Sequence, residues 1–231
     1  MPSSAVSDLS ANSQLIDLSH AVEHGMITYK GLPAPIICDY LSREASRSRY
    51  AAGTEFQIGK IEMIANTGTY LDSPFHRCAD GDDLSQLKLE LLADLDCVVV
   101  RVTDRRDRAI DRLPIDLATL KGKALLVHTG WDAHWRTDQY FEGHPHLTGA
   151  LANQLVAAGV TLVGIDSFNI DSIDDGTRPV HSALLRAGIP IVEHMCGLAA
   201  VPDRGARFFA VPVKVKGMGS FPVRAFARLA Q

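Results

Sequence analysis

Short apolar runs separated by turn residues dominate the hydrophobic pattern of this chain. CVVVRV (97–102), ALLVHTG (124–130) and TLVGID (161–166) are apolar and rich in β-branched residues, which is typical of buried strands. FQIGKIEMIA (56–65) instead alternates apolar and polar residues, which predicts a strand with one buried face. QLIDLSHAV (14–22) and, near the end of the chain, RFFAVPVKV and FPVRAFARLA are also strand-like.

Helical periodicity is clearest in LTGALANQLVAAGV (147–160), where apolar residues recur at spacings of three and four. Thr148 is placed to cap the N-terminus of this helix, and Gly159 to end it. VHSALLRAGI (180–189) predicts a second, shorter helix that leads into the strand IPIVE. LSQLKLELLADL (84–95) is ambiguous and indicates at most a short helix.

The order of these elements indicates the class of fold. Strands and helices mix without strict βαβ alternation, so we expect an α/β fold with a layered, mixed β-sheet core and flanking helices rather than a regular doubly wound sheet. We find no internal repeat and no low-complexity linker, which favours one domain over residues 14–231. Residues 1–13 are polar and predict a flexible N-terminal arm.

Charge and the lengths of the apolar runs exclude several classes of partner. The net charge of −4 offers no basic surface for nucleic acid, and the arginines of RVTDRRDR alternate with aspartates. The apolar runs have the length of strands, so none is expected to span a membrane. The N-terminus has neither the basic nor the apolar region of a secretory signal. We therefore expect a cytoplasmic protein that binds neither nucleic acid nor membrane.

The chain has four cysteines, and none forms a C-x-x-C pair. Spacing alone leaves a disulfide open, but reduced and mostly buried thiols fit a cytoplasmic protein better. The four are Cys38, Cys78, Cys97 and Cys196.

Side chains that carry chemistry gather in IANTGTYLDSPFHRCADGDD (64–83), directly after a predicted strand. Gly68 allows the backbone to turn, and Pro74 stiffens the segment between Asp72 and His76. Such a loop can direct a carboxylate and an imidazole to one point. A capping aspartate in a turn with a surface histidine explains the same pattern equally well.

RPVHSALLRAGIPIVEHMCGL (178–198) holds a second candidate pair. His181 lies at the start of a predicted helix, and Glu193 ends the apolar strand that follows. A glutamate behind Ile-Pro-Ile-Val is costly if it is buried without a partner, and a metal ion or a histidine would offset that cost. A strand end that emerges into solvent is the alternative.

Two further segments have weaker signals. VGIDSFNIDSIDDGT (163–177) places four aspartates after a strand, and such aspartates are more often turn formers and helix caps than ligands. HTGWDAHWRTDQYFEGHPHL (128–147) is rich in histidine and aromatic residues. It is predicted either to line a pocket for a planar substrate or to form a solvated loop with a few packed rings.

Several of these motifs, in this order, resemble the cyclase family of metal-dependent hydrolases, which includes bacterial kynurenine formamidase and isatin hydrolase. They are DLSHAV, NTGTYLDSPFH, HTGW, HPHL, VGID, VHSALL and GIPIVE with the GL that follows, and they run from residue 16 to 198. The resemblance implies that family's swivelling β/β/α fold and a homo-oligomer, a dimer or a tetramer. It also implies that the substrate is a small molecule.

The family's signature is His-x-Gly-Thr-His-x-Asp-x-Pro-x-His, and this chain has NTGTYLDSPFH at 66–76. Asn66 and Tyr70 therefore replace the two earlier histidines. By resemblance, Asp72, His181 and Glu193 are the ligands of one divalent metal ion, with zinc ahead of manganese. The histidines that would hold a second ion are missing, so a second ion is doubtful.

The resemblance then assigns the remaining roles. His76 matches the family's proton-shuttling histidine, and Tyr70 is placed to donate a hydrogen bond to a substrate oxygen. Asn66 is expected to bind substrate or to support a metal ligand through a hydrogen bond. The implied activity is hydrolysis of a small amide or lactone by metal-activated water, with N-formylated aromatic amines such as N-formylkynurenine as the substrate class. The alternative is a metal-free, non-catalytic member of the family that binds a small molecule.

Overall fold

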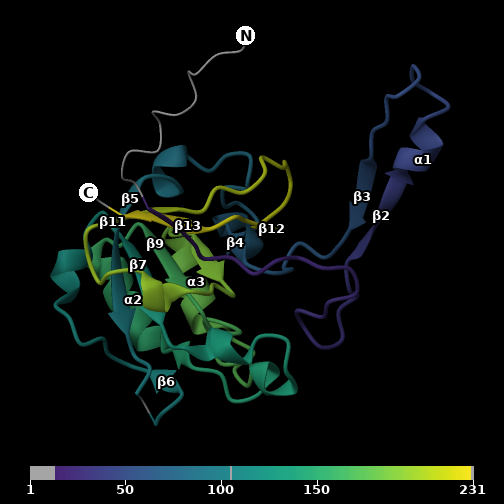
Figure 1. The fold of residues 1–231 in the computed structure, drawn as a ribbon. Coiled ribbons are helices and arrows are strands. Elements are labelled where there is room, and N and C mark those ends of the chain that lie inside the picture. Colours follow the sequence, from purple (N-terminus) through teal and green to yellow (C-terminus); the bar gives the residue numbers. More distant parts are fainter. Residues whose placement is uncertain (1–13, 105, 230–231) are drawn as a thin grey trace.

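The structure is a computed structural model that describes residues 14–104 and 106–229 (Figure 1). The predicted arm over residues 1–13 lies outside the described residues. A nine-stranded sheet forms the body, in the order β1-β13-β11-β5-β7-β9-β10-β4-β12. In chain order these strands are β1 (Leu15–Asp17), β4 (Tyr70–Asp72), β5 (Leu95–Arg101), β7 (Ala124–His128), β9 (Leu162–Ile165), β10 (Ile191–Glu193), β11 (Ala206–Phe209), β12 (Ser220–Pro222) and β13 (Phe226–Leu229).

The sheet is mixed, as the irregular order of elements predicts. The adjacent strands β5, β7, β9 and β10 run parallel to one another, and each flank of the sheet is antiparallel. The central strands are buried on both faces, which explains why their sequences read as continuous apolar runs. The expected layered α/β core is confirmed.

Alternate residues of the central strands enter two separate cores. Val98 and Leu125 belong to the core that packs against the helices, while Val99 and Leu126 belong to the core on the opposite face. The helices α2 (Gly149–Ala158) and α3 (Pro179–Arg186) pack side by side on the first face. Loops and 3-10 turns cover the second face; they contribute Leu84, Leu92, Leu198 and Val201.

Both predicted helices are present: α2 lies within 147–160, and α3 overlaps 180–189. The Thr148 side chain accepts a hydrogen bond from the Leu151 N–H and caps α2, and Gly159 ends it in the left-handed region at φ 73°. Gly159 therefore does what its position in the sequence indicates. Residues 84–95 form no α-helix, but turns and a 3-10 segment at Leu89–Leu91.

A strand is present within 56–65, as predicted, but the prediction that one of its faces is buried is wrong. Strand β3 (Ile58–Glu62) pairs with β2 (Ile36–Leu41) in a two-stranded ribbon that projects from the body beside the short helix α1 (Arg43–Ser46), as Figure 1 shows. All five residues of β3 are exposed. The alternation of apolar residues is real, but no other part of the described chain covers them.

A smaller two-stranded sheet pairs β6 (Ala109–Ile110) with β8 (His146–Leu147) in parallel. Among the residues that the structure describes, no helix has the length and apolar character needed to cross a membrane. The four cysteines are free.

Gly219, directly before edge strand β12, comes very close to the turn that follows β4. The Ser73 N–H donates to the Gly219 carbonyl at 2.7 Å, and a Cβ on Gly219 would lie 2.5 Å from the backbone N and Cα of His76. Only a residue without a side chain fits here, because a backbone atom has no rotamer with which to move aside.

We therefore expect Gly219→Ala to lower the free energy of unfolding by about 1–3 kcal/mol, the usual cost of forcing atoms into a packed site. Chemical denaturation measures this change. Gly176→Ala is the matched control, because a Cβ there meets nothing within 4 Å. Equal stability of the two variants would contradict the close approach.

Candidate metal and substrate site

Three neighbouring strands bring Tyr70, Asp72 and Glu193 together. In the pairing of β4 with β10, Glu193 lies opposite Tyr70, and in the pairing of β4 with β12, Ser220 lies opposite Asp72. The register of the sheet therefore sets the distances between residues that are more than a hundred positions apart.

Asp72 is a fully buried carboxylate with one hydrogen-bonded oxygen and a second oxygen whose neighbour is His181 Nε2, at 3.6 Å. Its Oδ1 accepts hydrogen bonds from the Ser220 hydroxyl and from Asn66 Nδ2, the latter at 3.4 Å. Its Oδ2 has no hydrogen-bond partner within the described parts of the chain. A buried carboxylate oxygen without a partner is costly, which is typical of an atom that binds a cation.

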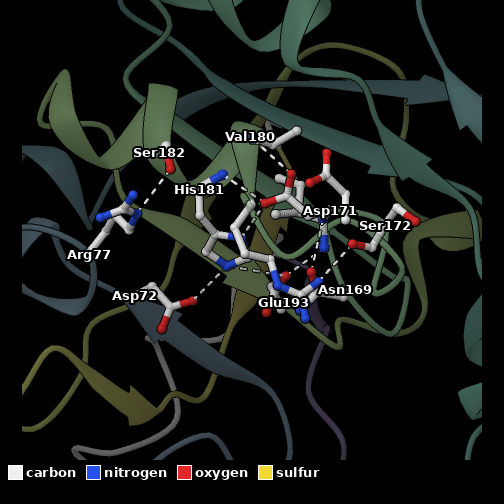
Figure 2. A network of polar contacts seen from close by, with 12 residues as sticks. Asp72, Arg77, Asn169, Asp171, Ser172, Val180, His181, Ser182 and Glu193 are labelled. Carbon is white, nitrogen blue, oxygen red and sulfur yellow. Dashed lines mark hydrogen bonds and ion pairs between the residues drawn. The ribbon is translucent and has the colours of Figure 1, made fainter.

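His181 is held with its second nitrogen toward this oxygen (Figure 2). Its Nδ1 lies 2.7 Å from Asp171 Oδ2, so the Asp171 carboxylate fixes the ring. Its Nε2 lies 3.6 Å from Asp72 Oδ2 and 3.7 Å from Glu193 Oε1. This is the arrangement in which a carboxylate orients an imidazole that binds a metal through its other nitrogen.

The charges around His181 strongly favour a positive charge at this point. Burial by itself lowers the pKa of His181, but the carboxylates of Glu193, Asp171 and Asp72 outweigh it and raise the pKa to about 10. A divalent cation and the imidazole proton satisfy the same carboxylates, so binding of a metal here would displace the proton.

Asp171 also holds the start of α3. Its carboxylate accepts hydrogen bonds from the backbone N–H groups of Val180 and His181, at 2.7 and 3.0 Å. The aspartate-rich segment 163–177 thus contains a helix cap, as the favoured interpretation predicts. That same cap orients His181, a function that the sequence pattern does not reveal.

Glu193 is buried and makes two hydrogen bonds. Its Oε1 accepts from the Ile170 N–H at 2.6 Å, and its Oε2 accepts from the Tyr70 hydroxyl. The Tyr29 hydroxyl lies 2.7 Å from that of Tyr70 and accepts from Asn169 Nδ2 at 3.3 Å. Burial and then the Glu193 charge raise the pKa of both tyrosines well above the ordinary value, so both phenols keep their protons.

His76 lies at the open side of the group. Its Nδ1 is 2.9 Å from the Ser220 hydroxyl and 3.7 Å from Asp72 Oδ1, and its side chain is 37% exposed. Among the described residues, the histidine, cysteine and acidic side chains whose ligand atoms all lie within 4.8 Å of one another are Asp72, His76 and His181. Glu193 adjoins this group through His181.

These residues surround a cavity of about 260 Å³. It is lined by Tyr29, Leu32, Asn66, Tyr70, His76, Arg77, Asn169, Arg178, His181 and Glu193. The site residues Asn66, Tyr70, His76, His181 and Glu193 therefore face one space, and the buried Asp72 contacts three of them. The donor set of carboxylates and imidazole suits a divalent ion such as Zn²⁺ or Mn²⁺.

The aromatic segment 128–147 does not line this cavity. Tyr140 is buried instead, with its hydroxyl 3.1 Å from Nδ1 of the buried His194. Trp135 packs edge-on against both rings. Of the two interpretations given above, packed rings describe this part of the segment better.

Four residues of the site have no clear signal in the sequence. Tyr29 lies in a segment rich in turn residues, and Ser220 is a single polar residue before an apolar run. Asn169 and Asp171 lie in the loop sequence that follows a predicted strand. Only the high density of aspartates at 163–177 marks any of them.

Comparison with known proteins places this geometry in context. The family described as "Putative cyclase" matches residues 16–172, more than half of the chain. The chain belongs to this family. Kynurenine formamidases from Bacillus cereus and Bacillus mycoides are each 29% identical over 218 residues, which are 94% of this chain and 98% of theirs.

Solved structures of the cyclase family share the fold. An isatin hydrolase bound to the product analogue thioisatinate matches with a TM-score of 0.77 at 18% identity, covering 95% of this chain and 93% of that one. A protein described as a potential metal-dependent hydrolase with cyclase activity matches with a TM-score of 0.69 at 23% identity, covering 95% of this chain and all of that one.

The contact between Tyr70 and Glu193 can be tested through stability. Tyr70→Phe leaves a buried carboxylate oxygen without its donor, so we expect it to lower the free energy of unfolding by about 1–3 kcal/mol. Denaturant unfolding of Tyr70→Phe and of the wild type checks the prediction, and a variant as stable as the wild type would disprove it.

Proposed function

We propose that the protein is a metal-dependent hydrolase that cleaves a small amide or lactone, with N-formylated aromatic amines of the N-formylkynurenine type as its substrate class. The observation that carries the proposal is the unpartnered, buried Oδ2 of Asp72, which lies 3.6 Å from His181 Nε2 beside a cavity. The Bacillus kynurenine formamidases support the reaction class, because their alignment with this chain spans nearly the whole of both proteins.

Asp72, His181 and Glu193 would hold one divalent ion, zinc in the first place and manganese in the second. When bound, such an ion supplies an activated water and polarises the scissile carbonyl group. The spacings of 3.6 and 3.7 Å from His181 Nε2 to the two carboxylates support His181 as their shared neighbour, whereas the group whose ligand atoms all lie within 4.8 Å of one another has His76 in place of Glu193. The Tyr70 hydroxyl is engaged with Glu193 where the family signature has a histidine, which supports one ion rather than two.

His76 is assigned the proton transfers. Its ring is anchored by Ser220 at Nδ1 and lines the open cavity. In amide hydrolysis it takes a proton from the attacking water and returns it to the leaving nitrogen as the C–N bond breaks, so that a formamide yields formate and an amine. The Tyr70 phenol keeps its proton near neutral pH and donates a hydrogen bond to Glu193. Asn66 Nδ2 donates a hydrogen bond to Asp72 Oδ1.

Two variants separate a ligand from a proton carrier. We expect the wild-type protein to hold about one metal ion per chain. Glu193→Gln removes a charged ligand and should weaken binding by at least the roughly 10–100-fold that loss of an outer-shell partner causes. His76→Gln should keep the metal and lose turnover by roughly 10²–10⁴-fold. Elemental analysis and formamide hydrolysis measure the two effects, and His134→Gln, outside the cavity, is the control.

Other outcomes would change the assignment. Loss of metal in His76→Gln would make His76 a ligand together with Asp72 and His181, the group whose ligand atoms lie within 4.8 Å of one another. A wild-type protein with neither metal nor turnover, yet stabilised by a small ligand, would favour the binding protein over the hydrolase.

We also propose that the protein is a cytoplasmic homo-oligomer, a dimer or a tetramer, with a small molecule as its substrate and no nucleic-acid or membrane partner. The projecting ribbon of β2 and β3 supports an oligomer, because an isolated two-stranded ribbon is at best marginally stable in water. It exposes Tyr40 by 74%, Phe56 by 53% and Ile61 by 50%. A second copy of the chain is the occupant that would cover them.

The double variant Phe56→Asp/Ile61→Asp should shift the protein toward the monomer, because two charges would be buried in the interface. Light scattering after size-exclusion chromatography measures the mass. Val213→Asp is the control, since Val213 is 60% exposed and lies outside the ribbon. A wild-type monomer, or an assembly that the double variant leaves intact, would contradict this interface.

A further inference from the structure

Two arginines lie at the cavity beside the residues assigned to the reaction. Arg77 directly follows His76 and is exposed, and Arg178 is half-buried and precedes α3, three residues before His181. Both line the cavity. Figure 2 shows Arg77 beside Ser182, on the first turns of the helix that carries His181.

Both arginines make their hydrogen bonds with neutral groups. Arg77 Nε donates to the Ser182 hydroxyl at 2.9 Å, and Arg178 Nη1 donates to the Ser172 carbonyl at 2.8 Å. A guanidinium has five N–H donors, so most of the donors on each remain for a ligand.

Neither arginine has a carboxylate within 4.0 Å in the described part of the chain, whereas Arg101, Arg207 and Arg224 each do. Hydrogen bonds from the Thr177 hydroxyl and N–H to Asp175 Oδ1, and to a smaller extent the charge of Arg178, lower the pKa of Asp175. The charges of Arg77 and Arg178 are therefore not neutralised by direct ion pairs.

The backbone at Arg178 gives an independent reason to assign it a function. Its φ of 49° and ψ of 61° lie in the left-handed region, which is unfavourable for a residue with a Cβ and is usually occupied by glycine or asparagine. Such strain is concentrated at functional sites, where the surrounding structure maintains it. A glycine here would relieve the strain and would remove the guanidinium from the cavity.

The cavity thus presents two signs of charge. The Glu193 carboxylate lines it and the buried Asp72 contacts its lining, both of which favour a cation, and the lining also includes two arginines. We infer that Arg77 and Arg178 form a subsite for a carboxylate group of the substrate. Guanidinium groups suit carboxylates because they pair with them through short, charge-assisted hydrogen bonds.

This inference rests on the proposed hydrolase and narrows its substrate class. The substrate would be an aryl amide or lactone that also carries a carboxylate. That carboxylate lies at Arg77 and Arg178, and the scissile acyl group lies at His76 and His181. The arginines bind and orient the substrate and take no part in the proton transfers.

The test pairs two substrates with four arginine variants of the metal-loaded protein, one of which is a control. Formanilide is neutral, and 2-formamidobenzoate is the same formamide with a carboxylate on the ring. The wild type should prefer the carboxylate. Arg77→Gln and Arg178→Gln should each lower kcat/KM for 2-formamidobenzoate by about 10–100-fold, the loss expected for a hydrogen bond to a charged group. The loss should lie mainly in KM, with formanilide changed less than about twofold.

The control is Arg186→Gln, in the last turn of the same helix but outside this cavity, which should change neither substrate. Arg178→Gly separates binding from folding, because it relieves the left-handed backbone and should be at least as thermally stable as Arg178→Gln. It should still lose the preference for the carboxylate. An equal loss on both substrates, or a wild type without that preference, would overturn the subsite.

Failure of the hydrolase leaves the subsite testable. If the wild type hydrolyses neither compound, the proposed function fails, and calorimetric binding of the same two compounds decides the subsite. Tighter binding of 2-formamidobenzoate that is lost in Arg77→Gln and Arg178→Gln would support it. Equal binding of both compounds, or no binding, would overturn it.

Discussion

The burial of two carboxylates beside one imidazole is the constraint on which this site depends. Asp72 and Glu193 are both fully buried, and charges in such surroundings are costly unless each oxygen finds a partner. Ser220, Tyr70 and the Ile170 N–H satisfy three of the four oxygens, and His181 lies between the two carboxylates. Because these partners come from different strands and loops, the site exists only when β4, β10 and β12 pair in register.

Tyr70 shows how one side chain changes the chemistry of an inherited site. A neutral imidazole at this position would offer a lone pair to a cation, whereas a protonated phenol offers a hydrogen to Glu193. Burial keeps the phenol protonated, and Tyr29 lies close enough to bond it from the other side. The hydrogen bond fixes Glu193, and it is the reason for proposing one ion rather than two.

The sequence predicted the helices and strands better than it predicted which parts of the chain pack against them. Strands β5, β7 and β9 were found because burial on both faces makes their sequences apolar, and α2 because its cap and final glycine act locally. Strand β3 was misjudged, because alternation reports which residues are apolar and says nothing about what covers them. The buried strands at the centre of a sheet can be predicted from the hydrophobic pattern alone, whereas the exposure of a projecting ribbon cannot.

The same limit applies to the site. Asp72, His76, His181 and Glu193 were singled out by their motifs and by resemblance, and the structure brings them together, although their roles remain proposals. Ser220 and Tyr29 were missed, because a serine in a strand and a tyrosine in a turn-rich segment have no distinguishing pattern. Their importance arises from pairing across the sheet and from the path of a loop, which depend on the whole fold.

The opposed charges of the cavity have a consequence for how a ligand enters. Asp72 and Glu193 alone would repel an anion, and the arginines alone would attract it without orienting its acyl group. If Arg77 and Arg178 hold the carboxylate of a substrate as proposed, a molecule that carries both a carbonyl and a carboxylate is oriented by charge. On this proposal, the buried carboxylates that favour a cation and the strained Arg178 backbone belong to one arrangement, in which charge sets the orientation of the substrate before any bond is broken.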